Sequence, residues 1–408
     1  MEYIHRELER KFLAMNSAFK AIMVTGARQT GKTTMLRHLA KGQNRNYVTM
    51  DKFDDRELAR KDPELFFQIH QPPILIDEIQ KAPELFETIK ILCDNTEECG
   101  LFWLSGTWSM RMLKQAGDSL AGRICILRMY SLSQREIAGI LPEEPMDFSF
   151  QVLKSRSRLF PENNAAEIYT HIWRGGMPAR LGMDSEQAEE YWNSYVDSYL
   201  MRDAVEDNGV TDTTSFHRFI RACAALCGQQ VNYSLLAEAA GISGSTARNW
   251  LKILQDMGII YLLEPYSGND LKRMIRNPKL YFCDTGLCAH LASWPLRDAL
   301  MNSAVAGHYF ENHAVAEILR NNTYAPAKAL MSYYRDREQR EIDLILEQNG
   351  ILHPLEIKMS ARPDPRIVQE FAMLPKGGRT LGNGGIICMI GRPYPITEDQ
   401  SFIPANLI

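Results

Sequence analysis

Short apolar runs alternate with longer stretches of helical periodicity over the first 145 residues of the chain. Runs of this length are typical of strands that are buried on both faces. Because strands that alternate with helices indicate a parallel sheet covered by helices, residues 1–145 are predicted to form an α/β domain. The five predicted strands lie at residues 21–24, 47–50, 73–76, 101–104 and 124–127.

Three further blocks follow. Residues 146–214 have mostly helical periodicity and contain an amphipathic run from Glu186 to Val205, which predicts a helical lid or connector. Residues 215–295 are predicted to be helical and then rich in strands, and residues 296–408 to form a second α/β domain. A chain of 408 residues exceeds the size at which one hydrophobic core stops growing, so several domains are expected.

Composition and charge narrow the classes of function. The net charge of -4 and the pI near 6.2 provide no global attraction to nucleic acid, so any contact with DNA needs a local basic patch. The cysteines form no C-x-x-C pair, which indicates reduced thiols. The charged N-terminus and the lack of an apolar run of membrane-spanning length predict a cytoplasmic protein without a membrane partner.

A glycine-rich segment lies between the first predicted strand and a predicted helix. It reads Gly-x4-Gly-Lys-Thr, which is the pattern of a phosphate-binding loop. In such a loop the backbone amides surround the phosphates, Lys32 reaches the β- and γ-phosphates, and the Thr33 hydroxyl binds Mg²⁺. The segment predicts an ATP site made of Gly26, Ala27, Arg28, Gln29, Thr30, Gly31, Lys32, Thr33 and Thr34.

Polar side chains also end two further predicted strands. Asp77 and Glu78 follow the third strand, where a solvated turn is the alternative interpretation of two carboxylates. After a phosphate-binding loop, Asp77 is predicted to hold Mg²⁺ and Glu78 to polarise the attacking water. Ser105 and Thr107 follow the fourth strand and are predicted to sense the γ-phosphate or that water.

Arg123 is a further candidate in this block. It ends the sequence Ser-Leu-Ala-Gly-Arg, just before the fifth predicted strand. An arginine in this place is able to neutralise transition-state charge in the site of a neighbouring subunit. A surface salt bridge is the alternative, and the residues alone leave both open.

Three strings in this block belong together: Thr-Gly-Ala-Arg-Gln-Thr-Gly-Lys-Thr-Thr at 25–34, Leu-Ile-Asp-Glu-Ile-Gln-Lys-Ala-Pro at 75–83, and Ser-Leu-Ala-Gly-Arg at 119–123. They resemble a group of prokaryotic AAA-type ATPases whose C-terminal half is a domain of unknown function. The resemblance extends to residues 195–203, 284–287 and 341–358. It implies an additional-strand P-loop fold, assembly as an oligomer, and a finger role for Arg123. This chain has Ser105-Gly-Thr107 where the group more often has Thr-Gly-Ser, which keeps both hydroxyls.

Residues 233–257 have the pattern of a helix-turn-helix, and strands predicted at 259–263 and 279–282 add a wing. The two helical runs join at Gly241, and Ser243 is placed to cap the second. Winged helices bind DNA or serve as adaptors to proteins. The candidates for DNA contact are Ser245, Thr246, Arg248, Asn249 and Lys252 on the second helix, and Lys272, Arg273, Arg276 and Lys279 on the wing.

The last block places carboxylates on predicted strands. Glu356 and Lys358 share one face of a strand, and a turn at 347–350 brings Asp343 beside them. With Glu311 from the preceding helix, Asp343 and Glu356 are predicted to bind Mg²⁺, and Lys358 to activate water.

This order of residues is similar to the PD-(D/E)xK nuclease core, including that of archaeal Holliday-junction resolvases. Glu341 or Ile342 replaces the proline expected before Asp343. The resemblance implies a restriction-endonuclease-like fold that either cuts DNA or only binds it.

The sequence therefore predicts an ATPase that uses ATP and Mg²⁺ and acts as a homo-oligomer on DNA, in particular branched or otherwise unusual DNA. Two alternatives stay open. One is a nucleotide-controlled signalling module whose later domains hold a protein partner. The other is a DNA-binding regulator that binds ATP and scarcely hydrolyses it.

Overall fold

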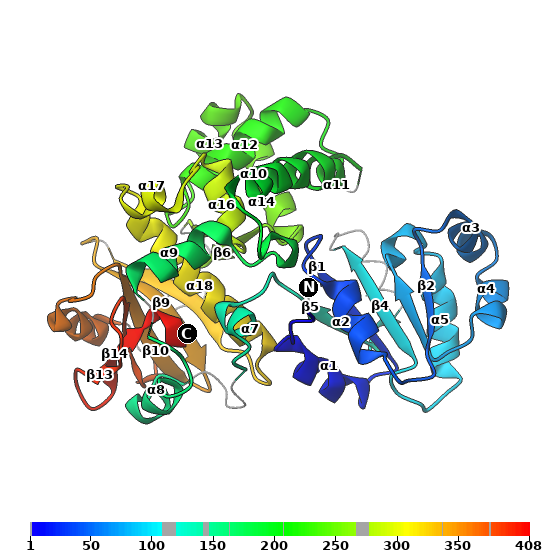
Figure 1. Ribbon diagram of the computed structural model, residues 1–408, viewed down its shortest axis with the longest axis horizontal. Coiled ribbons are helices and arrows are strands. Elements are labelled where there is room, and N and C mark those ends of the chain that lie inside the picture. The colour runs from blue at the N-terminus through cyan, green and yellow to red at the C-terminus, as the bar shows by residue number, and fades with distance from the viewer. Residues whose placement is uncertain are drawn as a thin grey trace. The chain divides into compact units, whose positions relative to one another are not determined.

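The computed structural model describes residues 2–107, 120–141, 147–162, 164–206, 208–266, 277–336, 338–374 and 377–408. They belong to two compact units: unit 1 comprises Met1–Leu132, Arg202–Gly209 and Asp256–Gly258, and unit 2 comprises Ser133–Met201, Val210–Gln255 and Ile259–Ile408. The predicted fold class is confirmed, because a parallel-sheet α/β domain is followed by a helical region and a C-terminal sheet domain (Figure 1).

Unit 1 contains a five-stranded sheet in which all neighbouring strands are parallel. All five strands predicted from apolar runs are confirmed. Because the strands are parallel, their carboxyl ends lie at one edge of the sheet, where Gly26, Asp77 and Thr107 end their strands. The order across the sheet is β2 (Asn46–Thr49), β3 (Ile74–Asp77), β4 (Phe102–Thr107), β1 (Ala21–Gly26) and β5 (Ile124–Arg128).

Helices cover this sheet and close its core. Trp103 on β4 is completely buried; Phe12 contacts its ring edge-on at 4.8 Å, and Asn16 accepts its indole hydrogen bond at 2.7 Å. Burying an aromatic side chain of this kind contributes about 1.5–3 kcal/mol, so the core fixes the strands whose ends carry the polar residues. The helices are α1 (Leu8–Asn16), α2 (Lys32–Leu39), α3 (Phe53–Lys61), α4 (Pro63–Ile69) and α5 (Leu85–Asp94), with a 3₁₀ turn at Ile79–Lys81.

The helical part of unit 2 comes from the chain between the two sheets and from the start of the last block. α18 (Ala306–Tyr324) is buried over most of its length and packs against α9, β7 and β10. The others are α7 (Gln134–Ala138), α8 (Phe150–Arg156), α9 (Ala165–Arg174), α10 (Ser185–Ser194), a π-helix (Tyr195–Leu200), α11 (Met201–Glu206), α12 (Thr213–Ala225), α13 (Tyr233–Ala240), α14 (Gly244–Asp256), α16 (Thr285–Leu291) and α17 (Arg297–Met301).

Unit 2 also contains a hairpin and a mixed sheet. The hairpin pairs β6 (Ile260–Leu263) with β7 (Lys279–Phe282), whereas residues 267–276 of the predicted wing, including Lys272, Arg273 and Arg276, lie outside the described residues. The larger sheet has the order β13 (Tyr394–Pro395), β14 (Gln400–Pro404), β12 (Gly384–Cys388), β10 (Ile351–Lys358), β9 (Glu341–Gln348) and β8 (Leu330–Arg335), with β11 (Thr380–Leu381) beside β10.

The first segment of unit 1 is shorter than the first predicted block, which extends to residue 145. The reason lies in α7, where the side chain of Gln134 donates to the carbonyl oxygen of Ala405 at 2.8 Å and its backbone amide donates to Glu317 at 3.1 Å. These bonds tie the residues after Leu132 to unit 2. Within the described part of the chain, no helix combines the length and the apolarity that crossing a membrane requires.

Candidate functional site

The loop between β1 and α2 has the backbone conformation of a phosphate-binding loop. Gly26 has a φ of 153°, and a Cβ atom there would lie 2.1 Å from the carbonyl oxygen of Met129, so only glycine fits. Gly31 (φ 96°) and Gln29 (φ 62°) also have positive φ angles, which turn the loop tightly. Because α2 begins directly after Gly31, its amino-terminal amides are available to a bound anion.

Lys32 is buried inside this loop, with 6% of its surface exposed. Its ammonium donates to the carbonyl oxygens of Gly26 at 3.1 Å and Ala27 at 2.8 Å. Burial lowers the pKa of Lys32 to about 8, although the carboxylate of Glu78 acts in the opposite direction. The phosphates of ATP would supply the negative charge that this buried cation lacks.

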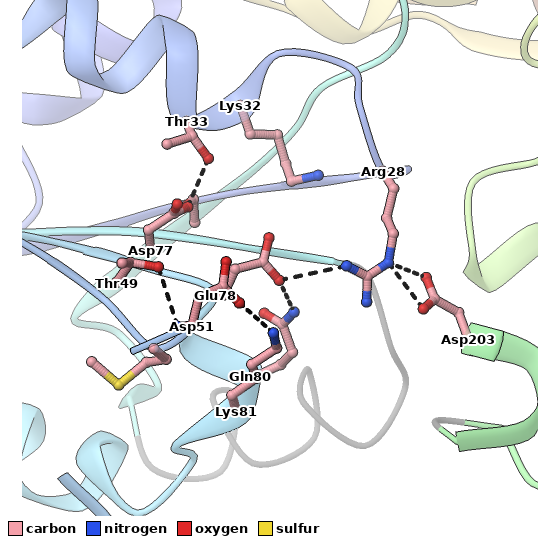
Figure 2. Close-up of polar contacts among 12 residues, drawn as sticks. Arg28, Lys32, Thr33, Thr49, Asp51, Asp77, Glu78, Gln80, Lys81 and Asp203 are labelled. Carbon is pink, nitrogen blue, oxygen red and sulfur yellow. Dashed lines mark hydrogen bonds and ion pairs between the residues drawn. The ribbon is translucent and has the colours of Figure 1, made fainter. Parts of the chain in front are cut away.

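Asp77 at the end of β3 lies beside Thr33 (Figure 2), whose hydroxyl donates to Asp77 Oδ1 at 2.7 Å. The Ser105 hydroxyl donates to the same oxygen, and the Tyr47 hydroxyl approaches Oδ2 at 3.4 Å. A buried carboxylate next to a hydroxyl forms the kind of oxygen set that Mg²⁺ prefers. The residues present therefore fit the predicted Mg²⁺, with Thr33 and Asp77 as its ligands.

Glu78 and Thr107 complete this edge of the sheet. Glu78 has a φ of 57°, an uncommon conformation for a residue with a side chain, and Gln80 donates to its Oε2 atom. Thr107 pairs with Gly26 across the sheet, and its buried hydroxyl has no hydrogen-bond partner among the residues that the structure describes. Leaving a buried hydroxyl unsatisfied costs about 1–3 kcal/mol, which a bound phosphate or water would offset. Of the two predicted sensors, Thr107 is free for this role and Ser105 is bound to Asp77.

The predicted helix-turn-helix is formed by α13 and α14. Ser243 caps α14 as predicted, because its hydroxyl accepts the amide of Thr246 at 3.1 Å. The apolar face packs inward, where Trp250 contacts the rings of Phe216 and Phe219. On the opposite face Ser245, Arg248, Asn249 and Lys252 are exposed, whereas Thr246 is half-buried. Arg248 stacks on Tyr233 at 4.1 Å, which holds its guanidinium at the surface.

The predicted cluster in the last block forms on neighbouring strands. A two-residue turn at Asn349 and Gly350, both with positive φ, joins β9 to β10 and sets their register. Asp343 accepts the ammonium of Lys358 at 3.2 Å, and Glu356 accepts it at 2.6 Å. The predicted grouping of Asp343, Glu356 and Lys358 is therefore confirmed.

The metal set predicted for this cluster needs a correction, because Lys279 lies among the carboxylates. Lys279 was predicted on an exposed wing, yet only 3% of its surface is exposed. Its ammonium contacts Glu311 at 2.8 Å, Asp343 at 3.5 Å and also Glu341. Among the described residues no three His, Cys, Asp or Glu side chains are arranged to hold a metal ion. A lysine of β7 thus supplies the positive charge expected from Mg²⁺.

The pKa values of the cluster agree with this correction. Burial, together with the charge of Asp343, raises the pKa of Glu356 to about 9, and Lys358 offsets this only in part. Burial and Asp343 likewise raise the pKa of Glu311 to about 7. Burial alone would lower the pKa of Lys279, but Glu311, Asp343 and Glu341 raise it above its usual value.

Known families cover the chain in three parts. Residues 18–138 match the family described as "AAA domain". This segment is an AAA-type P-loop ATPase domain. Residues 165–298 match the family described as "Domain of unknown function (DUF8612)", and residues 306–408 match "Domain of unknown function (DUF4143)". The three matches follow the order of the parallel-sheet domain, the helical region and the C-terminal sheet.

Two curated relatives match most of the chain. They are "Uncharacterized protein Rv2008c" of Mycobacterium tuberculosis and "Uncharacterized protein Mb2031c" of Mycobacterium bovis, each 27% identical over 390 residues, or 95% of this chain and 80% of the relative. Among solved structures, "The walker-type atpase paby2304 of pyrococcus abyssi" matches with a TM-score of 0.43 and 13% identity, over 71% of this chain and 96% of that one.

Arg123 lies far from the phosphate-binding loop of its own AAA domain. It precedes β5, whose first residue pairs with Ala21 at the start of β1, whereas the loop follows the end of β1. Its guanidinium contacts both carboxylate oxygens of Asp94. The predicted salt bridge is therefore present, and a finger role is possible only toward another subunit.

Two residues of the AAA domain site were missed from sequence. Arg6 is buried and donates to the carbonyl oxygens of Thr30 at 2.8 Å and Tyr130 at 2.7 Å, which ties the loop to the strand end beside it. Asp203 binds Arg28 of the loop. Arg6 lies in a charged N-terminal run, and nothing in that sequence distinguishes it from its neighbours. Asp203 belongs to the string at 195–203 to which the family resemblance extends, but the resemblance gave it no role.

The lowered pKa of Lys32 makes a pH dependence of ATP affinity testable. The protonated ammonium binds phosphate, so above pH 8 the free protein must take up a proton when ATP binds. The dissociation constant of ATP is expected to rise about tenfold between pH 8.5 and pH 9.5. Tenfold per pH unit is the largest change that the uptake of one proton can cause. Titration with a fluorescent ATP analogue would measure it. Lys32→Met should bind weakly at every pH, and an equally steep rise in that variant would contradict the assignment to Lys32.

Proposed function

We propose that this chain is a Mg²⁺-dependent ATPase that acts on DNA as an oligomer assembled through its AAA domains. The observation that carries the ATPase part is the grouping of Lys32, Thr33, Asp77 and Glu78 around one loop. Lys32 would bind the β- and γ-phosphates of ATP, and Thr33 with Asp77 would hold Mg²⁺. When bound, Mg²⁺ supplies positive charge that stabilises the transferring phosphoryl group.

The remaining residues have defined roles in this proposal. Glu78 accepts a proton from the attacking water or orients it, and Thr107 donates its hydroxyl to the γ-phosphate or to that water. Arg123 of a neighbouring subunit neutralises charge in the transition state. The hydroxyls of Thr33 and Ser105 both donate to Asp77. Glu78, the next residue, is therefore the carboxylate that we assign as the base.

The DNA part of the proposal depends on the exposed face of α14. Arg248, Asn249 and Lys252 are exposed there at helical spacing, which suits contacts with phosphates and base edges. The last block is proposed to bind DNA without cleaving it, because Lys279 holds the carboxylates that a metal would need.

ATP turnover measured with single-stranded, duplex and four-way-junction DNA tests this proposal. We expect a rate increase of several-fold, greatest with the junction. The double variant Arg248→Ala/Lys252→Ala should lose this increase and keep its rate without DNA. Arg366→Ala, which removes another exposed arginine of unit 2, is the matched control and should retain the increase. A rate that no form of DNA changes would leave the signalling module as the better explanation.

A further inference from the structure

Arg28 in the phosphate-binding loop lies between two carboxylates, Asp203 and Glu78 (Figure 2). Its Nε atom donates to both oxygens of Asp203, at 2.9 and 2.7 Å, and its Nη1 atom lies 3.9 Å from Glu78 Oε2. The three side chains are shielded from solvent, with 16%, 5% and 18% of their surfaces exposed. Charge-assisted hydrogen bonds in such surroundings are strong, so the position of Arg28 is well defined.

In this arrangement Glu78, the carboxylate that hydrolysis needs, already has two polar neighbours. Glu78 Oε2 accepts a hydrogen bond from Gln80 and lies near the positive charge of Arg28. A general base must point toward the water that it activates. The contact with Gln80 and the nearby guanidinium of Arg28 instead hold the Glu78 carboxylate in its present position.

Arg28 is also placed to leave Glu78 when ATP binds. It is the third residue of the loop whose amides surround the phosphates, and the phosphates carry more negative charge than either carboxylate. Three anions would then compete for one guanidinium: Asp203, Glu78 and the γ-phosphate. The contact of Arg28 with Asp203 is shorter than its contact with Glu78, so the ion pair with Asp203 opposes the movement of Arg28 toward ATP.

We propose that Asp203 holds Arg28 in a resting position beside Glu78, and that Arg28 moves to the γ-phosphate when this ion pair opens, which frees Glu78. The inference rests on the proposed ATP hydrolysis, and it makes Arg28 and Asp203 positioning residues for that reaction. Asp203 lies on α11, directly after the π-helix at Tyr195–Leu200.

The variant Asp203→Asn tests the inference through the kcat and KM of ATP hydrolysis. Loss of the carboxylate charge is expected to raise kcat about fivefold, equivalent to about 1 kcal/mol of barrier, and to lower KM. Arg28→Gln should raise KM, and Asp203→Asn should have no further effect in that background, because Asp203 acts only through Arg28. Asp203→Glu keeps the charge and should stay near the wild type.

Two further variants keep the test decisive. Should Asp203→Asn fail to fold, Arg28→Lys replaces it, because an ammonium cannot span both carboxylates, and kcat should again rise. Glu57→Gln breaks an exposed ion pair of the same unit and should change neither constant. Wild-type turnover together with an unchanged or lower kcat in Asp203→Asn, or in Arg28→Lys where Asp203→Asn does not fold, would overturn the inference alone. Absence of turnover from the wild type as well as from every variant would instead refute the proposed hydrolysis.

Discussion

Glu78→Gln is expected to lower ATP turnover at least about 100-fold while ATP affinity stays within about threefold, because a glutamine amide keeps the shape of the side chain but accepts no proton. The phosphate contacts of the loop do not involve Glu78, so binding should persist. Steady-state phosphate release would give the turnover rate, and titration with a fluorescent ATP analogue would give the affinity.

Glu84→Gln provides the matched control for this prediction, since Glu84 is an exposed glutamate at the start of α5 in the same unit. It should retain both turnover and affinity. A Glu78→Gln variant that still turns over at a tenth of the wild-type rate or more would show that another group accepts the proton. Slow turnover in the wild type as well would favour a regulator that uses ATP only as a ligand.

The nucleotide site could be predicted from the sequence because most of its parts are close together along the chain. The strand, the loop with Gly26 and the helix that begins at Lys32 are contiguous, and the positive φ angles of Gly26, Gln29 and Gly31 all fall within the motif. Asp77 could be added because parallel strands bring their carboxyl ends to the same edge of the sheet. Its contact with Thr33 joins two predicted residues that are 44 positions apart.

The residues that restrain this site could not be predicted from the sequence in the same way. Arg28 and Asp203 are 175 positions apart, and neither hydrophobic periodicity nor spacing indicates that α11 returns to the loop. The burial of Lys279 was missed for a related reason. A basic residue near a predicted wing is usually solvated, and only tertiary packing brings β7 to the carboxylates of β9 and α18. Long-range ion pairs of this kind depend on the assembled fold.

Lys279→Met should destabilise unit 2 by about 3–5 kcal/mol, because it leaves Glu311, Glu341 and Asp343 close together without the buried cation that compensates them. Thermal unfolding with and without Mg²⁺ would measure this. Mg²⁺ should raise the unfolding temperature of the variant by binding to the carboxylates that have lost their cation. Lys154→Met, which removes an exposed lysine of the same unit, should change neither stability nor its response to Mg²⁺. A stable Lys279→Met protein that is insensitive to Mg²⁺ would refute the role of Lys279 as the internal cation of this cluster.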